Sequence, residues 1–162
     1  MAELPDEVEA VFGNFRTAEI ATFSKDGTPV AVEVTPVWLA DRGRFLATAS
    51  IGLGTKAYNL RRNPKLSLLF SEPRASGLTG PAFVLVQGDA TVSELTTWDD
   101  DLAEYFPVLW NYQPAGRRWG ADPVTRRLMD WYYMRLKIDI TPRRIRWWPG
   151  GDMTAEPREV TL

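Results

Sequence analysis

The spacing of valines within residues 30–38 limits the possible folds of this chain more than any other feature. Valines recur at positions 30, 32 and 34, which is the period of a β-strand and not of a helix. A turn at Lys25-Asp26-Gly27 joins this strand to an earlier one over residues 18–24, because glycine can supply the positive φ of a hairpin turn. Pro36 cannot donate a ladder hydrogen bond, so we expect a bulge or a sheet edge there.

Similar patterns predict four more strands and four helices. Gly88 indicates a bulge or a close backbone approach within a strand. The helices are expected over residues 5–14, for about eight residues from an N-cap at Thr55, from Thr97 to about residue 110, and from Asp122-Pro123 to residue 130. The last dozen residues are expected to form a frayed tail. The four further strands are expected over residues 44–50, 65–71, 83–92 and 134–140.

About six antiparallel strands with hairpin-length turns hide their edges best in a closed or nearly closed barrel. The lack of regular βαβ crossovers excludes a parallel α/β sheet. We therefore expect a mainly β fold with a few helices, in a single domain over residues 1–162.

The composition excludes several kinds of chemistry. The chain has no cysteine and no histidine, which excludes disulfides, thiol catalysis and the common zinc sites and triads. A net charge of −2 argues against a nucleic-acid binder that works by electrostatics. Neither a signal peptide nor a membrane span is expected, so the protein is expected to be cytoplasmic. The run Asp99-Asp100-Asp101 favours a helix N-terminus over a metal site.

The densest set of polar residues follows the strand at residues 44–50. Thr48 and Ser50 point to one face of that strand, and Lys56 falls in the first turn of the next helix, with Asn59 one turn later. A helix start with free amides, a nearby cation and two hydroxyls is suited to bind an anion, above all a phosphate. The alternative is that Lys56 and its basic neighbours form a solvated helix face. The glycine spacing before Lys56 does not match a nucleotide-binding loop.

Several motifs resemble a known family. They are Asp26-Gly27-Thr28-Pro29, Thr35-Pro36-Val37-Trp38, Lys56-x-x-Asn59-Leu60-Arg61-Arg62-Asn63-Pro64 and residues 86–92, with a looser match at residues 142–147. In this order and spacing they resemble the split β-barrel flavoprotein superfamily. That group holds the pyridoxamine 5′-phosphate oxidase-like FMN-binding proteins and the deazaflavin (coenzyme F420)-dependent oxidoreductases.

The resemblance implies a homodimer of six-stranded split barrels with two cofactor sites at its interface. It implies that the cofactor phosphate lies near Ser50 and Lys56, that the ring lies over the strand from Val34 to Pro36, and that Gln87 faces the ring. A C-terminal aromatic residue, Trp147 or Trp148, would close the pocket from the partner subunit. The cofactor-binding residues expected from the motifs and the resemblance together are Val34, Thr35, Pro36, Thr48, Ser50, Lys56, Asn59, Gln87 and Trp147.

The expected activity is hydride transfer between FMN or coenzyme F420 and a small substrate, with the cofactor supplying the chemistry. Pyridoxamine phosphate oxidases hold their substrate with arginine and histidine, and haem-binding relatives commonly use a histidine ligand. The absence of histidine therefore argues against both activities. No side chain is singled out as a catalytic acid or base. Two alternatives remain open at this point: a flavin-binding protein without catalysis, and a barrel that has lost its cofactor.

Overall fold

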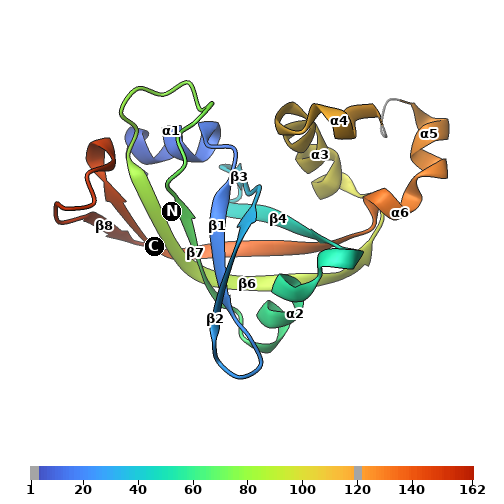
Figure 1. Cartoon of the computed structure of the whole chain (residues 1–162), viewed down its shortest axis with the longest axis horizontal. Coiled ribbons are helices and arrows are strands. Elements are labelled where there is room, and N and C mark those ends of the chain that lie inside the picture. The colour runs from blue at the N-terminus through green and yellow to red at the C-terminus, as the bar shows by residue number, and fades with distance from the viewer. Residues whose placement is uncertain (1–3, 119–121) are drawn as a thin grey trace.

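A computed structural model describes residues 4–118 and 122–162. Their strands share one antiparallel sheet and include a long pair, β6 and β7, that runs through the molecule (Figure 1). The strands are β1 (Ala18–Phe23), β2 (Pro29–Val34), β3 (Val37–Leu39), β4 (Arg44–Ser50), β5 (Lys65–Phe70), β6 (Phe83–Thr96), β7 (Arg135–Trp148) and β8 (Arg158–Thr161). The helices are α1 (Asp6–Asn14), η1 (Ile51–Leu53), α2 (Thr55–Arg62), α3 (Asp100–Tyr112), α4 (Pro114–Arg117), α5 (Pro123–Leu128), α6 (Asp130–Tyr133) and η3 (Pro149–Gly151).

The link between β2 and β3 brings the two ends of the sheet together, as in a split barrel. The strand order is β2-β1-β5-β6-β7-β4-β3, so β2 and β3 stand at opposite ends of the path. Only Thr35 and Pro36 join them. Because three peptide units span at most about 11 Å, the two ends of the sheet must meet at this link. The other end of β2 stays free in the β1–β2 hairpin, which projects from the barrel (Figure 1).

The mainly β antiparallel barrel predicted from the sequence is confirmed, with eight strands in place of six. The strand predicted over residues 30–38 divides into β2 and β3, because the chain leaves one sheet end and joins the other at Pro36. The prediction of a frayed C-terminus is wrong. Residues 158–161 form β8, which pairs with β7 from Arg144 to Trp147.

The predicted helices are present, with boundaries and caps that differ from the prediction by a few residues. α2 has the predicted eight residues, but Gly54 occupies its N-cap position and Thr55 is its first helical residue. α3 begins after Asp99, whose side chain accepts from the Leu102 amide, and so the predicted start at Thr97 is wrong. Asp122 caps α5 as predicted, accepting from two backbone amides. The predicted helix over residues 122–130 ends earlier, at Leu128.

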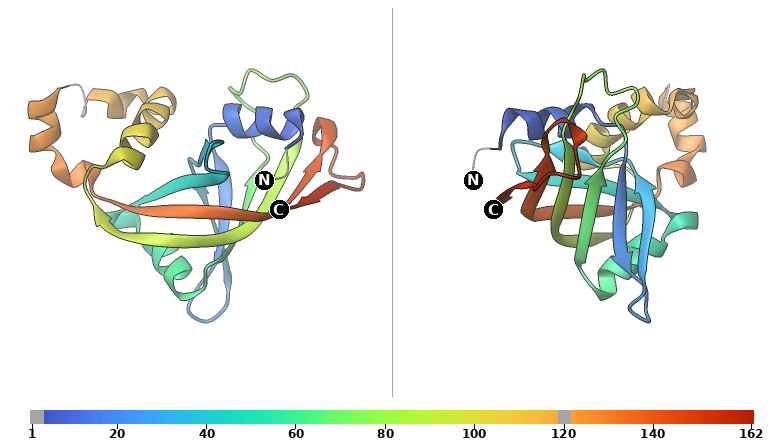
Figure 2. Two further views of the ribbon diagram at one scale, coloured as in Figure 1. Left: turned by 180° about the vertical axis from the view of Figure 1, so that it is seen from behind. Right: turned by 60° about the vertical axis from the view of Figure 1, so that its left-hand side comes forward.

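The main core fills the barrel beneath α1. Its centre is an aromatic group in which the Phe12 ring lies 4.7 Å from that of Phe45 and 5.3 Å from that of Phe70, measured between centroids. Val8, Val11 and Phe12 form the buried face of α1, at the helical spacing seen in the sequence. α1 therefore seals one end of the barrel (Figure 2).

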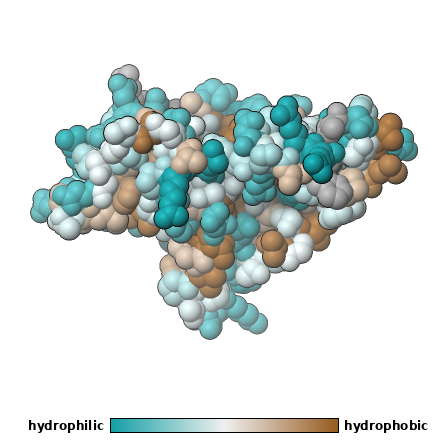
Figure 3. Space-filling view, turned by 45° about the horizontal axis from the view of Figure 1, so that its top comes forward, coloured by the Kyte–Doolittle hydropathy of each residue, from teal (hydrophilic) through white to brown (hydrophobic). Residues whose placement is uncertain are grey.

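Helices α3 to α6 lie between β6 and β7 in the chain and build a second core. Leu39 of β3 and Leu46 of β4 pack there against α3 and α6, while Phe45 and Ala47 face the barrel interior. The two faces of β4 thus serve two cores, as the period of two requires. The insertion also presents exposed apolar side chains on α5 and α6, and apolar surface gathers at that end of the molecule (Figure 3).

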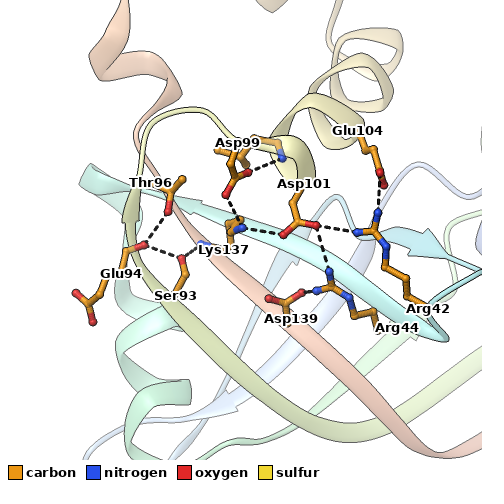
Figure 4. Close-up of polar contacts among 11 residues, drawn as sticks. Arg42, Arg44, Ser93, Glu94, Thr96, Asp99, Asp101, Glu104, Lys137 and Asp139 are labelled. Carbon is orange, nitrogen blue, oxygen red and sulfur yellow. Dashed lines mark hydrogen bonds and ion pairs between the residues drawn. The ribbon is translucent and has the colours of Figure 1, made fainter.

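Ion pairs fasten α3 to the barrel. Asp101 accepts from Lys137 Nζ at 2.7 Å, from Arg42 at 2.8 Å and from Arg44 at 3.2 Å (Figure 4). Asp99 accepts from the same Lys137 ammonium at 2.5 Å. The start of α3 is therefore held rigidly over β4 and β7, on the face that also carries Thr48 and Ser50.

Candidate functional site

A cavity of about 220 Å³ separates the β1–β2 hairpin from α2. Its walls come from the side of the hairpin that faces the helix and from the first turns of α2. The lining residues are Thr22, Val30, Val32, Glu33, Leu53, Thr55, Lys56 and Asn59. Two residues predicted to bind a cofactor, Lys56 and Asn59, therefore line one cavity.

Lys56 is a partly buried cation. Burial and the nearby charge of Arg135 both lower the pKa of Lys56. No carboxylate of residues 4–118 and 122–162 lies within 4 Å of its ammonium. Glu33 lines the same cavity but is exposed. A positive charge that is partly removed from water and has no counter-ion is costly, so this position favours an anion from solution.

Arg135 is a second cation of this kind, at the start of β7. Its residue surface is only 7% exposed, and it too makes no ion pair with the described part of the chain. Nη1 donates to the Met134 carbonyl at 3.1 Å, and the guanidinium lies 5.5 Å from the Phe106 ring centroid and 5.1 Å from that of Tyr132. Aromatic faces compensate part of the charge. Burial lowers the pKa of Arg135, but arginine remains charged at neutral pH.

The sheet register places Arg135 beside two predicted site residues. Ser50 of β4 is the direct partner of Arg135, and Thr48 is the partner of Lys137. Directly opposed side chains point to the same face of a sheet. Both hydroxyls therefore lie on the face of β4 that α3 covers, and Ser50 leads through η1 into the helix that carries Lys56.

Tyr105 connects this cluster to the link that closes the barrel. Its hydroxyl donates to the Thr35 carbonyl at 3.2 Å. Burial raises the pKa of Tyr105, and the Thr48 hydroxyl and the Arg135 charge partly oppose that shift. Tyr105 is therefore a neutral phenol at physiological pH. The structure thus brings Thr35, Thr48, Ser50 and Lys56 together around Arg135 and Tyr105.

Asn59 holds α2 against the sheet. Its Nδ2 donates to Thr22 Oγ1 at 3.1 Å, and its Oδ1 accepts from the Arg62 guanidinium. Asn59 is buried, at 2% exposure. The side chain therefore fixes the position of the helix that carries Lys56, in addition to lining the cavity.

The remaining predicted residues lie elsewhere. Val34 and Pro36 are buried at the link that closes the barrel. Gln87 is exposed on the outer face of β6 and lines a second hollow of about 250 Å³, which shares Thr22 with the Lys56 cavity. Because Thr22 points toward α2 while its neighbours Ala21 and Phe23 point away, Lys56 and Gln87 lie on opposite faces of the sheet.

Trp147 lies in the main core of its own chain. It is 6% exposed, and its Nε1 donates to Glu7 of α1 at 2.7 Å. Trp148 points to the other face and is half-buried. Within one chain, neither side chain is among the residues that line the Lys56 cavity.

Comparison with known proteins identifies the family. Residues 4–145 match the pyridoxamine 5′-phosphate oxidase family, so the chain belongs to it. No curated protein sequence matches the chain. Solved structures show the same fold at low sequence identity, as the split-barrel motifs predict.

Three solved structures illustrate the range of this fold. A heme-binding protein from Mycobacterium smegmatis has a TM-score of 0.62 at 21% identity, over 99% of this chain and 60% of that one. General stress protein 26 from Bacillus anthracis has a TM-score of 0.62 at 18% identity, over 97% of both chains. An F420 reductase has a TM-score of 0.56 at 18% identity, over 88% of this chain and 98% of that one.

The residues present fit some of these ligands better than others. A buried cation, Arg135, and a partly buried one, Lys56, both without counter-ions among the described residues and next to two hydroxyls, fit the phosphate of a flavin-type cofactor. A haem iron takes its protein ligand most often from histidine or cysteine, and this chain has neither. No helix in the described ranges is both long and apolar enough to cross a membrane.

Proposed function

We propose that this protein is a flavin- or deazaflavin-dependent oxidoreductase that binds the cofactor phosphate at the start of α2. The observation that carries the proposal is the pair of uncompensated cations, Lys56 and Arg135. Family membership supports a flavin-type cofactor, and the F420 reductase with this fold supports redox chemistry. The helix start and the Thr48 and Ser50 hydroxyls supply further groups suited to a phosphate.

The residues of the chain would bind and orient the cofactor, and the bound ring would supply hydride transfer. Lys56 and Arg135 would neutralise the phosphate. The link at Thr35 and Pro36, held by Tyr105, offers a rigid backbone edge for the ring. We assign no side chain as a catalytic acid or base, because the buried Tyr105 hydroxyl is already donated to Thr35.

We also propose that the functional unit is a homodimer. Lys56 and Gln87 lie on opposite faces of one sheet, and a second copy of the chain could bring both kinds of side chain to a single ligand. The β1–β2 hairpin exposes Phe23 and Val32. Exposed apolar side chains on a projecting edge strand are typical of an interface. Sedimentation velocity would test this, and a monomer at micromolar concentration would contradict it.

The cofactor proposal is tested by titrating FMN and coenzyme F420 while following quenching of their fluorescence. Lys56→Ala should weaken binding by about tenfold or more, since it removes a charged contact. Lys25→Ala, in the exposed β1–β2 turn, is the matched control and should bind as the wild type does. Failure of both cofactors to bind below about 100 μM, or about 5.5 kcal/mol, would refute the proposal.

Binding alone does not establish the oxidoreductase, so reduction of the bound cofactor is the second step. The bound cofactor should be reduced chemically and its reoxidation followed by absorbance with quinone or enone acceptors. Reoxidation faster than that of the free reduced cofactor supports catalysis. An equal rate with every acceptor would favour the alternative of a flavin-binding protein without catalysis.

A further inference from the structure

The far end of the helical insertion carries large apolar side chains that are exposed to water. Val124 and Leu128 of α5 are 69% and 75% exposed, and Trp131 of α6 is 61% exposed; we call these three the apolar stripe. Among the large apolar side chains of the described residues, only Leu53 at the Lys56 cavity is exposed to a similar extent. An exposed apolar patch of this kind indicates contact with something outside the chain.

The two short helices bury one side and expose the other. Tyr133 belongs to the second core, and Met129 and Tyr132 pack against that core. The members of the apolar stripe are separated by four and three residues, which is the spacing of neighbours on one helical face. The stripe is therefore additional to the apolar residues that stabilise the insertion.

Arginines without carboxylate partners lie beside the apolar stripe. Arg117 and Arg118 at the end of α4 and Arg127 on α5 are exposed, and none of them forms an ion pair with a described residue. Arg118 borders the same hollow as Leu128, which places charge and apolar surface side by side. Residues 114–131 contain four arginines and two aspartates and so carry a net charge of +2, in a chain whose net charge is −2.

We propose that this end of the insertion docks the protein on the surface of an anionic lipid bilayer. The apolar stripe enters the headgroup region, and Arg117, Arg118 and Arg127 contact the lipid phosphates. The inference does not depend on the proposed cofactor, because none of these residues lines the Lys56 cavity.

The kinds of residue present favour a bilayer over a protein partner. Tryptophan and leucine side chains are suited to the boundary between headgroups and acyl chains, and arginines are attracted to anionic headgroups. A stable protein interface uses about 20–30 residues on each side, whereas the stripe and its three arginines are far fewer. A second copy docking through the same surface would bring two positively charged patches together, which opposes self-association there.

The position of the insertion allows contact with a flat surface. α5 lies at one extreme of the molecule, away from the barrel, in two opposite views (Figures 1 and 2). Apolar surface gathers at that same end (Figure 3). Because residues 114–131 carry +2, the rest of the chain carries −4. An anionic bilayer therefore attracts this end and repels the barrel, which orients the molecule on the surface.

Sedimentation with vesicles of phosphatidylcholine, with and without phosphatidylglycerol, tests the proposal. We expect binding only to the anionic vesicles, and binding at least tenfold weaker at about 1 M salt, where the Debye length is about 3 Å. Leu128→Glu should weaken binding at least tenfold, because it replaces a buried apolar contact with a repelled charge. Its matched control is Met153→Glu, at a residue that is 50% exposed outside the insertion. Arg127→Gln should weaken binding about fivefold, and Arg74→Gln, at a side chain that is 91% exposed, should not.

Tryptophan quenching tests which side chain enters the bilayer. Bromine atoms on the acyl chains quench a tryptophan that lies among them. Anionic vesicles made with brominated lipid should therefore quench the wild type more strongly than Trp131→Phe, at equal amounts of bound protein. Equal quenching of the two proteins would refute insertion of the apolar stripe.

Binding of the wild type that does not depend on phosphatidylglycerol, or no binding at all, would overturn the proposal. Equal losses in Leu128→Glu and Met153→Glu would overturn the assignment to this surface. Sedimentation velocity without vesicles covers the alternative of a protein contact. Loss of a wild-type oligomer in Leu128→Glu would show that the stripe joins copies of the chain and would also overturn the proposal. Equal melting temperatures of all variants would exclude unfolding as the cause of a loss.

Discussion

Replacing Asp101 with asparagine removes a negative charge that three basic side chains share where α3 meets the barrel. Lys137 is only 13% exposed, so its contact with Asp101 is worth about 2 kcal/mol. Arg42 and Arg44 are more exposed and together add about 1 kcal/mol. We therefore expect a loss of about 3 kcal/mol, or roughly 6–12 °C in melting temperature for a chain of this size.

Urea denaturation followed by tryptophan fluorescence measures this loss at pH 7. Asp41→Asn is the matched control, because Asp41 contacts the same Arg42 but its side chain is 74% exposed. It should cost less than about 0.5 kcal/mol. A loss below about 1 kcal/mol in Asp101→Asn, or equal losses in both variants, would refute the argument that burial makes this carboxylate important.

The same contact predicts a pH dependence. Hydrogen bonding to Lys137, with the charges of Lys137, Arg44 and Arg42, lowers the pKa of Asp101 in the folded state. Its contribution is therefore complete above the unfolded value of about 3.9 and is lost as the pH falls through the folded pKa. The stability difference between wild type and Asp101→Asn should shrink below about pH 4. A difference that stays constant down to pH 2.5 would contradict this.

Two other substitutions test the fold. Gly88→Ala should destabilise the protein by about 2–4 kcal/mol in the same urea assay, because a Cβ there would lie 2.3 Å from the Thr141 carbonyl oxygen. Gly13→Ala is its control, with open space around the added methyl group, and should be neutral or stabilising. Trp147→Phe should cost about 1–3 kcal/mol, since the carboxylate of Glu7 loses its indole donor; an unchanged stability would argue against a structural role for that bond.

The strands of the barrel could be predicted because strand alternation and turns depend on residues that are close together in the sequence. The register of β4 follows from its alternation, and the bulge at Gly88 follows from a glycine in the middle of a strand. Pro36 marked an irregularity, but the sequence does not show that the chain changes from one end of the sheet to the other there. That event depends on β4 pairing with β7, a contact between segments about 90 residues apart in the chain, which places β3 at the opposite end of the sheet from β2. The C-terminal strand was missed for the same reason, since β8 is stabilised by pairing with β7.

The site was predictable in part for a similar reason. Lys56 could be proposed as an anion ligand because the helix start, the hydroxyls and the lysine lie within nine residues. Arg135 is 85 positions after Ser50 in the chain, and only the register of β4 against β7 makes them neighbours. The sequence around Arg135 does not show that this side chain will be buried, or that no described carboxylate will form an ion pair with it. The sequence therefore supports the proposal of an anion site at Lys56, whereas the second cation of that proposal emerges only from the tertiary structure.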